Sequence, residues 1–402
     1  MTFRAPTTYL FTRYVELIQN ALQREITRLR KPSSSLVIPV LDSFYGQMGY
    51  HLGWLDAQLL PVQPQTGKLL RPTLLLLAYE AAGANGCTFK REEKLHLGRA
   101  LPAAVAIELF HNFTLVHDDI EDGDWERRHR PTAWAVFGTP MALNLGNGLV
   151  SLSHLTLLTL FDEGVSTDLI ARLGSCFDRS ALTVMEGQHL DLCFETQEQV
   201  TIPHYLDMIT RKTAALMACA TEMGAMLGCS DEPTITALRQ FGLHLGTAFQ
   251  IRDDLLGIWA TRAESGKTPA GDVLRRKKTL PVLHTIQHAS PQDHAWLRTF
   301  YSQQEAPRSE QVGQVLSILE HTGSQEYCQH FLTEHCLLAR DALRRVPTPD
   351  VPLAQEAIAD LGALIEYVSE ELWPMKAGDQ AAVQEQALPL KAEPDCQEKD
   401  DQ

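Results

Sequence analysis

Residues Ala100–Asp122 read ALPAAVAIELFHNFTLVHDDIED, and this stretch is the strongest indication of the architecture. Its apolar residues recur three and four positions apart, without a glycine, which predicts an α-helix. On that helix Asp118 and Asp122 lie one turn apart on one face, with Asp119 alongside. Like charges at this spacing repel each other by about 0.2–0.5 kcal/mol per pair. We therefore expect something to offset the repulsion, either solvent and basic neighbours or a bound cation.

The same helical pattern continues along the rest of the chain. Helical runs are expected over residues 12–29, 71–84, 168–195 and 214–228. Alternating strand-like runs are almost absent, and no internal repeat of fixed period occurs. We expect an all-α protein with a helical segment over 1–31, one main domain over 32–373, and a polar, acidic tail over 374–402 that lacks the apolar residues to fold.

Composition excludes several classes of protein. The 402 residues are 44% hydrophobic and carry a net charge of −15, which argues against general nucleic-acid binding. The amino terminus lacks a basic leader followed by an apolar core, so we expect no signal peptide. No apolar run approaches the ~20 residues of a membrane span. These features predict a soluble, cytoplasmic protein.

The eight cysteines are scattered and form no CxxC pair, which is typical of reduced thiols in a cytosolic protein. One group is denser, because Cys328, His330, His335 and Cys336 lie close together in the sequence. Zinc sites of this kind need a second set of ligands, and no matching half is present. We therefore expect no zinc site from this group.

A second acidic pair follows in AFQIRDDLLGIW, where Asp253 and Asp254 interrupt an apolar run. Carboxylates embedded in apolar sequence need partners, and metal ions are the obvious ones. An ion pair with Arg252 is the structural alternative. Together with the first acidic group, this pair favours Mg²⁺, which binds a few carboxylates, several waters and substrate phosphate.

Basic residues occur at four places that could bind the phosphates. They are Lys68 with Arg71, Lys212 beside Thr213, Lys267, and Lys277 with Lys278. The Gly266–Thr268 tripeptide imitates the end of a phosphate-binding loop, but Thr261 stands where that motif needs glycine. Each lysine taken singly is more often a solvated surface charge. With two acidic groups they describe a Mg²⁺–diphosphate site.

At this point the chain resembles the trans-isoprenyl diphosphate synthases, also called polyprenyl synthetases. GKLLRP is similar to the family's GGKRxRP, and HDDIEDGDWERRHRPT to its first aspartate-rich region. MEGQHLDL, YLDMITRKTAAL, FQIRDDLLG and GKTPAGDVLRRKKTLPVL follow in the family's order. The resemblance spans roughly residues 48–373. It implies a helical bundle around a deep central cavity of the isoprenoid synthase type.

The resemblance also implies roles for individual residues. The Mg²⁺ ligands would be Asp118, Asp119, Asp122, Asp253 and Asp254. The other ligands of the allylic diphosphate would be Arg127, Lys212, Thr213, Gln250, Lys267 and Lys277. Isopentenyl diphosphate would be bound by Lys68, Arg71, His111 and Arg128. Gln188 and Asp191 would line the cavity. The implied reaction is ionisation of the allylic diphosphate and attack by isopentenyl diphosphate, and the implied assembly is a homodimer.

Product length is expected to depend on the residues just before the first aspartates. Phe113 lies five positions before Asp118, about 7.5 Å along a helix, and small Thr114 follows it. This arrangement resembles geranylgeranyl diphosphate synthases, so we expect a C20 product with C15 farnesyl diphosphate as the alternative. The alternative is that Phe113 only packs in the core and that another residue limits the product length.

Three positions depart from the family pattern, because Gly257 replaces an aspartate, Leu69 an arginine and Asn147 an aspartate. We expect Gly257 to weaken or alter Mg²⁺ binding without abolishing activity. Three rival functions stay open. A terpene synthase would use the same fold, a non-catalytic subunit of a heteromeric synthase would only bind, and a His–Asp phosphohydrolase would use His117.

Overall fold

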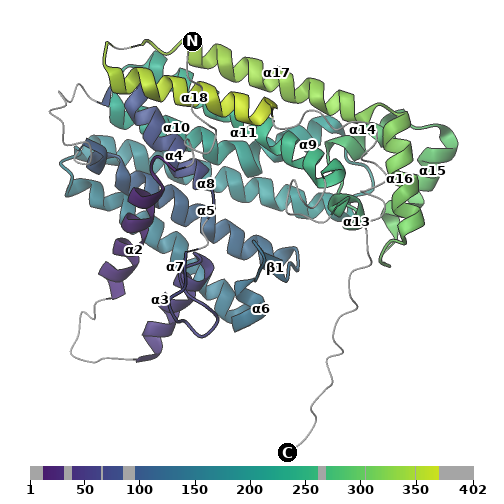
Figure 1. The fold of residues 1–402 in the computed structure, drawn as a ribbon, viewed down its shortest axis with the longest axis horizontal. Helices are drawn as coiled ribbons and strands as arrows, with labels where there is room; N and C mark the ends of the chain where they lie inside the picture. Colours follow the sequence, from purple (N-terminus) through teal and green to yellow (C-terminus); the bar gives the residue numbers. More distant parts are fainter. Residues whose placement is uncertain are drawn as a thin grey trace, which may run out of the picture. The chain divides into compact units, whose positions relative to one another are not determined.

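The computed structural model describes residues 12–30, 39–64, 67–84, 96–260, 269–303, 305–348 and 350–370. Regular structure in these residues is almost entirely helical, which confirms the all-α prediction (Figure 1). The helices are α2 Val15–Arg30, α3 Pro39–His51, α4 Leu70–Ala81, α5 Leu101–Glu121, α6 Ala133–Phe137, α7 Thr139–Leu158, α8 Thr167–Thr196, α9 Ile202–Ile209, α10 Ala215–Gly228, α11 Glu232–Trp259, α13 Gly271–Leu274, α14 Leu280–His288, α15 Pro291–Ser302, α16 Ser309–His321, α17 Ser324–Arg344 and α18 Pro352–Glu370.

Short elements connect some of these helices. The 3-10 turns are η2 His96–Arg99 and η3 Thr159–Phe161, and η4, Thr210–Ala214, is one turn of π-helix. A two-stranded antiparallel hairpin pairs β1, Glu126–Arg127, with β2, Arg130–Pro131. Its two-residue turn places Arg128 and His129 at φ values of 53° and 61°. Left-handed backbone at both turn residues matches the right-handed twist of a tight hairpin.

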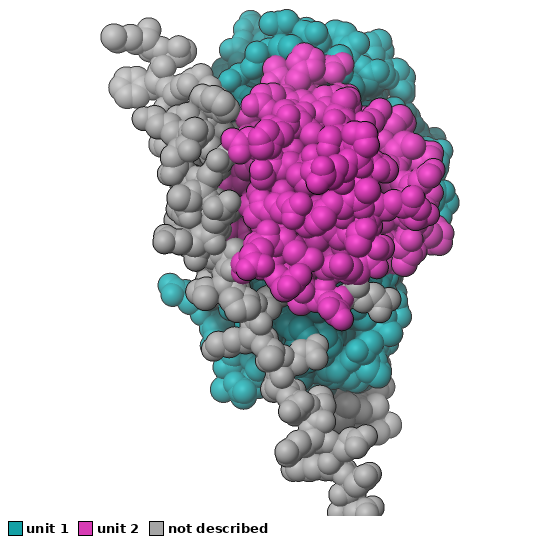
Figure 2. Space-filling view, turned by 90° about the vertical axis from the view of Figure 1, so that its right-hand side faces the viewer, with its two compact units in different colours: residues 1–188, 209–247, 335–369 teal, residues 189–208, 248–334, 370–402 magenta. Residues whose placement is uncertain are grey.

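The residues group into two compact units (Figure 2). Unit 1 comprises residues 1–188, 209–247 and 335–369, and unit 2 comprises 189–208, 248–334 and 370–402. Helices α8, α11 and α17 each contribute residues to both units. Lys267 and the tail expected over 374–402 lie outside the described residues.

Helices α4 and α10 and the first half of α5 are buried almost throughout and form the centre of unit 1. A helix that is apolar all round is stable only inside a core. Glycine allows the closest contact, because a Cβ atom on Gly224 would lie 2.2 Å from the carbonyl oxygen of Leu75. Helix α5 also packs along α7. The sequence that ends in the first aspartates is therefore held on two sides by neighbouring helices.

The expected amino-terminal helical segment is part of unit 1. Ile18 of α2 is fully buried. Arg13, just before α2, donates to Glu80 at 2.8 Å and also to Asp360 of α18. Tyr14 donates its hydroxyl to the same Glu80 at 2.6 Å. Glu80 is only 2% exposed, so this carboxylate depends on both donors.

Two further predictions concern membrane-spanning helices and the state of the cysteines. No helix among the described residues combines the length and apolarity that crossing a bilayer requires. Six cysteines are described, all as free thiols, whereas Cys87 and Cys396 lie outside the described residues.

Candidate functional site

The carboxyl end of α5 pairs its first two aspartates with different cations of unit 1. Lys212 places its Nζ 3.3 Å from Oδ1 of Asp118. Arg127 of β1 donates Nε–H to Oδ1 of Asp119 at 2.7 Å. Asp119 is 1% exposed, and its buried Oδ2 has no hydrogen-bond partner among the described atoms. One oxygen of this buried carboxylate is therefore left over for a cation that the protein itself does not supply.

Burial raises the pKa of both Asp118 and Asp119. It raises the pKa of Asp119 to about 6, against the opposing charge of Arg127. Burial also raises the pKa of Asp118; Lys212 lowers it, and the charge of Asp122 adds to the increase. Hard oxygen donors held in this state fit Mg²⁺, whose charge would favour the ionised carboxylates.

Within unit 1, the aspartates at the end of α5 do not form a preformed metal site. In the described ranges, no three His, Cys, Asp or Glu side chains converge on a point where they could hold an ion. Asp118 and Asp119 instead point to Lys212 and Arg127. A metal ion bound here would have to compete with these two basic side chains for the oxygens.

Lys212 and Thr213 lie in the π-helical turn η4, between α9 and α10. The turn passes directly over Gly187 of α8, where a Cβ atom would lie 2.6 Å from the Cα of Lys212. π-Turns within helices are frequent at functional sites, where they redirect side chains at a cost in backbone hydrogen bonding. The close contact explains the glycine of MEGQ and fixes the backbone that carries Lys212.

A basic cluster gathers beside the β1–β2 hairpin in unit 1. A Cβ atom on Gly67 would lie 2.5 Å from Nη2 of Arg128, so this glycine makes room for the guanidinium. Arg71 places Nη1 3.0 Å from Nε2 of His111. Lys68 donates to the hydroxyl of Tyr367, and its Nζ lies 4.9 Å from the centre of that ring. Guanidinium and ammonium groups so arranged suit diphosphate oxygens.

Two histidines within this cluster are kept neutral. Burial lowers the pKa of His111 well below its usual range, and Arg71 and Arg128 lower it further. Burial and the charges of Arg127 and Arg128 lower the pKa of His51 to about 3. Neutral rings add hydrogen-bonding atoms to the cluster without adding positive charge.

The sequence analysis missed Glu108, a buried acid whose negative charge compensates the positive charges of the basic cluster. Glu108 is 5% exposed and accepts a hydrogen bond from Nδ2 of Asn112 at 2.9 Å. Burial raises its pKa, whereas the charge of Arg71 opposes the rise. The signal was present in IELFHNF, because an acid inside an apolar run needs a partner. His51 and Tyr367 gave no comparable signal.

The second acidic pair belongs to unit 2, and its two members differ. Asp254 is 2% exposed and accepts hydrogen bonds from the hydroxyl of Tyr205, from Nε2 of Gln250 at 3.1 Å and from the amide of Leu280 at 3.5 Å. Burial raises its pKa to about 7. Protein donors thus occupy both oxygens of Asp254. The arrangement favours structural roles for Asp254 and Gln250 over the metal and diphosphate roles expected, and leaves half-buried Asp253 as the metal-ligand candidate.

Gly257 was interpreted as a lost aspartate, and its surroundings give it another role. A Cβ atom at this position would lie 2.1 Å from Oδ2 of Asp272. Asp272 is itself only 9% exposed. The space that a side chain would need at Gly257 is therefore filled by the carboxylate of Asp272. An aspartate here would have to displace that carboxylate and would add a second negative charge beside it, so its effect on Mg²⁺ binding stays a prediction.

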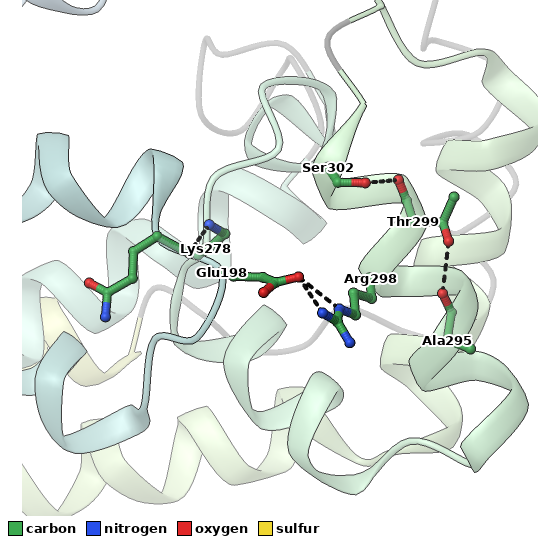
Figure 3. Close-up of polar contacts among 7 residues, drawn as sticks. Glu198, Lys278, Ala295, Arg298, Thr299 and Ser302 are labelled. Carbon is green, nitrogen blue, oxygen red and sulfur yellow. Dashed lines mark hydrogen bonds and ion pairs between the residues drawn. The ribbon is translucent and has the colours of Figure 1, made fainter.

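The adjacent lysines of RRKKTLP are used differently. Lys278 donates to the carbonyl oxygens of Phe194, Glu195 and Gln197 at 2.9, 3.1 and 2.7 Å. These carbonyls end α8, where a cation also interacts favourably with the helix dipole. Figure 3 shows Lys278 and, next along the chain from α8, the ion pair of Glu198 with Arg298 of α15. Lys278 therefore serves as a helix cap, and Lys277 is left as the candidate ligand.

Phe113 lies on α5 between two other rings. Its centroid is 5.4 Å from that of Phe110 and 4.7 Å from that of His117. The residue is 8% exposed and borders Gly146 of α7, where a Cβ atom would lie 3.5 Å from the Phe113 ring. Thr114 donates its hydroxyl back to the carbonyl of His111 at 2.7 Å. Neighbouring rings and α7 fix Phe113, which suits either core packing or a barrier.

Comparison with known proteins identifies the family. Residues 54–319 match polyprenyl synthetase. The chain belongs to the polyprenyl synthetase family. A (2E,6E)-farnesyl diphosphate synthase of Mycobacterium bovis is 38% identical over 311 residues, which cover 77% of this chain and 82% of that protein. A geranylgeranyl diphosphate synthase of Mycobacterium tuberculosis is 36% identical, covering 82% of this chain and 87% of that protein.

Solved structures of polyprenyl synthetases have the same fold. A polyprenyl synthetase from Streptomyces coelicolor has a TM-score of 0.76 at 31% identity, covering 90% of this chain and 99% of that one. A geranylgeranyl pyrophosphate synthetase from Pyrococcus horikoshii has a TM-score of 0.75 at 30% identity, covering 90% and 98%. The prediction of a prenyltransferase of this family is confirmed. The residue assignments themselves remain predictions.

Proposed function

We propose that the protein condenses isopentenyl diphosphate with an allylic diphosphate to give linear all-trans geranylgeranyl diphosphate. One observation carries the proposal. Consecutive arginines of one hairpin serve two separate groups, since Arg127 pairs with Asp119 whereas Arg128 lies against Gly67 in the basic cluster. An enzyme that joins two diphosphates needs two such anion sites side by side. A synthase acting on one prenyl diphosphate needs only the first.

Different basic residues of the chain would bind the two diphosphates. Lys212 and Arg127 would bind the leaving diphosphate and stabilise the charge that accumulates as the allylic bond breaks. Lys68, Arg71 and Arg128 would hold isopentenyl diphosphate so that its double bond reaches the allylic cation. The released diphosphate would take the proton that restores the alkene. Neutral His111 would donate or accept a hydrogen bond at the second diphosphate without adding charge.

Polyprenyl synthetases depend on a divalent metal ion, and for this chain we propose Mg²⁺. The candidate ligands are Asp118, Asp119, Asp122 and Asp253, and the unpartnered oxygen of Asp119 supports that choice. When bound, Mg²⁺ would neutralise the diphosphate and make it a better leaving group.

Product analysis tests the proposal. Purified protein is incubated with isopentenyl diphosphate, geranyl diphosphate and Mg²⁺, and the products are dephosphorylated and separated. Geranylgeraniol as the main alcohol supports it, and farnesol makes the protein a farnesyl diphosphate synthase, the activity named for one relative. A hydrocarbon formed from the allylic substrate alone indicates a terpene synthase. No turnover, with both substrates bound, indicates a non-catalytic subunit.

We further propose a homodimer formed through α7 and α8. His154 of α7 contacts Phe177 and Asp178 of α8, so the two helices are neighbours. Their outer faces carry large exposed apolar side chains, namely Leu155, Leu158, Leu182 and Met185. Several large exposed apolar side chains on neighbouring helices are typical of a protein interface, and the family resemblance indicates a second copy of the chain as the partner.

Light scattering tests the dimer. The wild type should have twice the mass of the chain, and the pair Leu155→Glu with Leu182→Glu should give monomers. Leu337→Glu is the matched control, because Leu337 is equally exposed but lies on α17. A monomeric wild type, or dissociation by the control alone, would contradict this interface.

A further inference from the structure

Two histidines from distant parts of the sequence meet in unit 1. His244 lies on α11 and His335 on α17, 91 residues apart. Their Nδ1 atoms are 3.3 Å apart, and the ring planes are inclined by 46°. Both side chains are half-buried, so solvent reaches the pair. His335 belongs to the group whose missing second half argued against zinc, and α11 supplies a partner that the sequence spacing does not reveal.

The separation of the two nitrogens matches metal coordination. Bonds of about 2.0–2.1 Å from a tetrahedral zinc ion to two imidazole nitrogens place those nitrogens about 3.3–3.4 Å apart. The observed 3.3 Å therefore needs no movement of either helix. Without a metal, the same contact is a hydrogen bond for which one ring must carry its proton on Nδ1. Both nitrogens must be unprotonated for an ion to be bound.

We propose that His244 and His335 form a two-imidazole site for a divalent transition metal ion, with zinc as the reference ion, that links α11 to α17. Water molecules would complete the coordination, because no third His, Cys, Asp or Glu joins the pair in the described part of the chain. Imidazole ligands select zinc, nickel and copper over magnesium. The site is thus chemically distinct from the carboxylates of α5.

The surroundings favour the neutral form of His244 and limit the affinity. Burial lowers the pKa of His244, and the charge of Arg345 lowers it further. Arg345 also donates to Gln240, one helical turn before His244, so its charge stays close to the pair. A nearby cation repels a metal ion. We therefore expect reversible binding that stabilises the fold rather than a permanently occupied structural site.

Thermal unfolding with metal analysis tests the site. All samples carry Cys193→Ser, because exposed Cys193 lies 3.6 Å from Nε2 of His189 and would bind the same ions. Zinc at about tenfold excess over its dissociation constant should raise the midpoint by about 2 °C. His244→Gln and His335→Gln should each lose this increase and one bound equivalent in equilibrium dialysis. Any increase caused by magnesium should be the same in the wild type and in both variants, because magnesium does not favour imidazole ligands.

His330→Gln is the matched control, because His330 is an exposed residue of the same helix α17. It should retain both the temperature increase and the bound equivalent. Bound Cu²⁺ gives a direct measurement by electron paramagnetic resonance. The spectrum should show coupling to two imidazole nitrogens in the wild type and to one in His244→Gln or His335→Gln. Equal zinc content in the wild type and His244→Gln would overturn the proposal and leave the pair as a hydrogen bond only.

Discussion

A Cβ atom on Gly187 of α8 would lie 2.2 Å from the backbone nitrogen of Lys212, so the two backbones are in direct contact. No side chain fits between them. The position of Lys212, and with it the contact to Asp118, is therefore set by a residue that has no functional group of its own.

Gly187→Ala should accordingly lower activity by displacing Lys212. A shift of about 1 Å at a diphosphate ligand is expected to lower kcat by about 10–100-fold. Gly174→Ala is the control on the same helix, where an added Cβ meets nothing within 4 Å. That variant should keep full activity and gain about 0.5–1 kcal/mol of stability. Steady-state kinetics and thermal unfolding of both variants decide, and unchanged kcat in Gly187→Ala would exclude the positioning role.

Gly257→Ala should destabilise unit 2, because the new methyl group must displace the carboxylate of Asp272. We expect a loss of about 1–3 kcal/mol in urea unfolding. Gly257→Asp should be worse, since it adds a like charge at the same contact. A second change, Asp272→Ser, should recover part of the loss in Gly257→Ala. Two single changes whose effects simply add would show that the residues do not compete for space.

Substitutions of Lys277 and Lys278 should have different effects, because we expect Lys277 to bind substrate and Lys278 to cap α8. Lys278→Ala removes donors to three carbonyls at the end of α8 and should cost about 1–3 kcal/mol of stability with kcat little changed. Lys277→Ala should raise the KM for the allylic diphosphate and lower kcat with little change in stability. Kinetics and unfolding of both variants check this, and the reverse pattern would exchange the two roles.

His51 should make the fold sensitive to mild acid. Its pKa is about 3 in the folded protein, mainly through burial, against about 6.5 in an unfolded chain. The stability it contributes is therefore complete above pH 6.5 and is lost progressively as the pH falls toward 3. At pH 5 the loss is about 1–2 kcal/mol. His51→Gln should lose correspondingly less between pH 7 and pH 5 in urea unfolding, and parallel curves would show that folding does not lower the pKa of His51.

Phe113→Ala should lengthen the product. If the ring blocks the growing chain, its removal should shift the main product beyond C20 while the enzyme remains active. Phe300→Leu, a substitution of a fully buried ring on α15, controls for general loosening and should leave the distribution unchanged. Chromatography of the dephosphorylated products measures both. An unchanged distribution from a folded Phe113→Ala enzyme would reduce the residue to core packing.

The all-α class and the order of the motifs could be predicted because helical periodicity and motif spacing are local properties. Which cation binds which aspartate could not, since Lys212 reaches Asp118 from 94 positions along the sequence (118 to 212) through tertiary packing. Adjacent lysines look alike in sequence, and only the carbonyls at the end of α8 distinguish Lys278 from Lys277. Gly257 shows a related limit, because the sequence does not reveal that Asp272 occupies the space beside this glycine.

The contact of Arg13 with Glu80 and Asp360 has a consequence for how the chain is made. Unit 1 is assembled from three separate segments, the last of which is residues 335–369. A ribosome releases Arg13 and Glu80 long before Asp360, which follows Arg13 by 347 residues. During synthesis, the surface of the early helices that α18 covers in the folded unit therefore stays exposed until α18 has been made. Completion of unit 1 thus requires synthesis of α18, and until then the apolar surface that its earlier helices expose is open to non-native association.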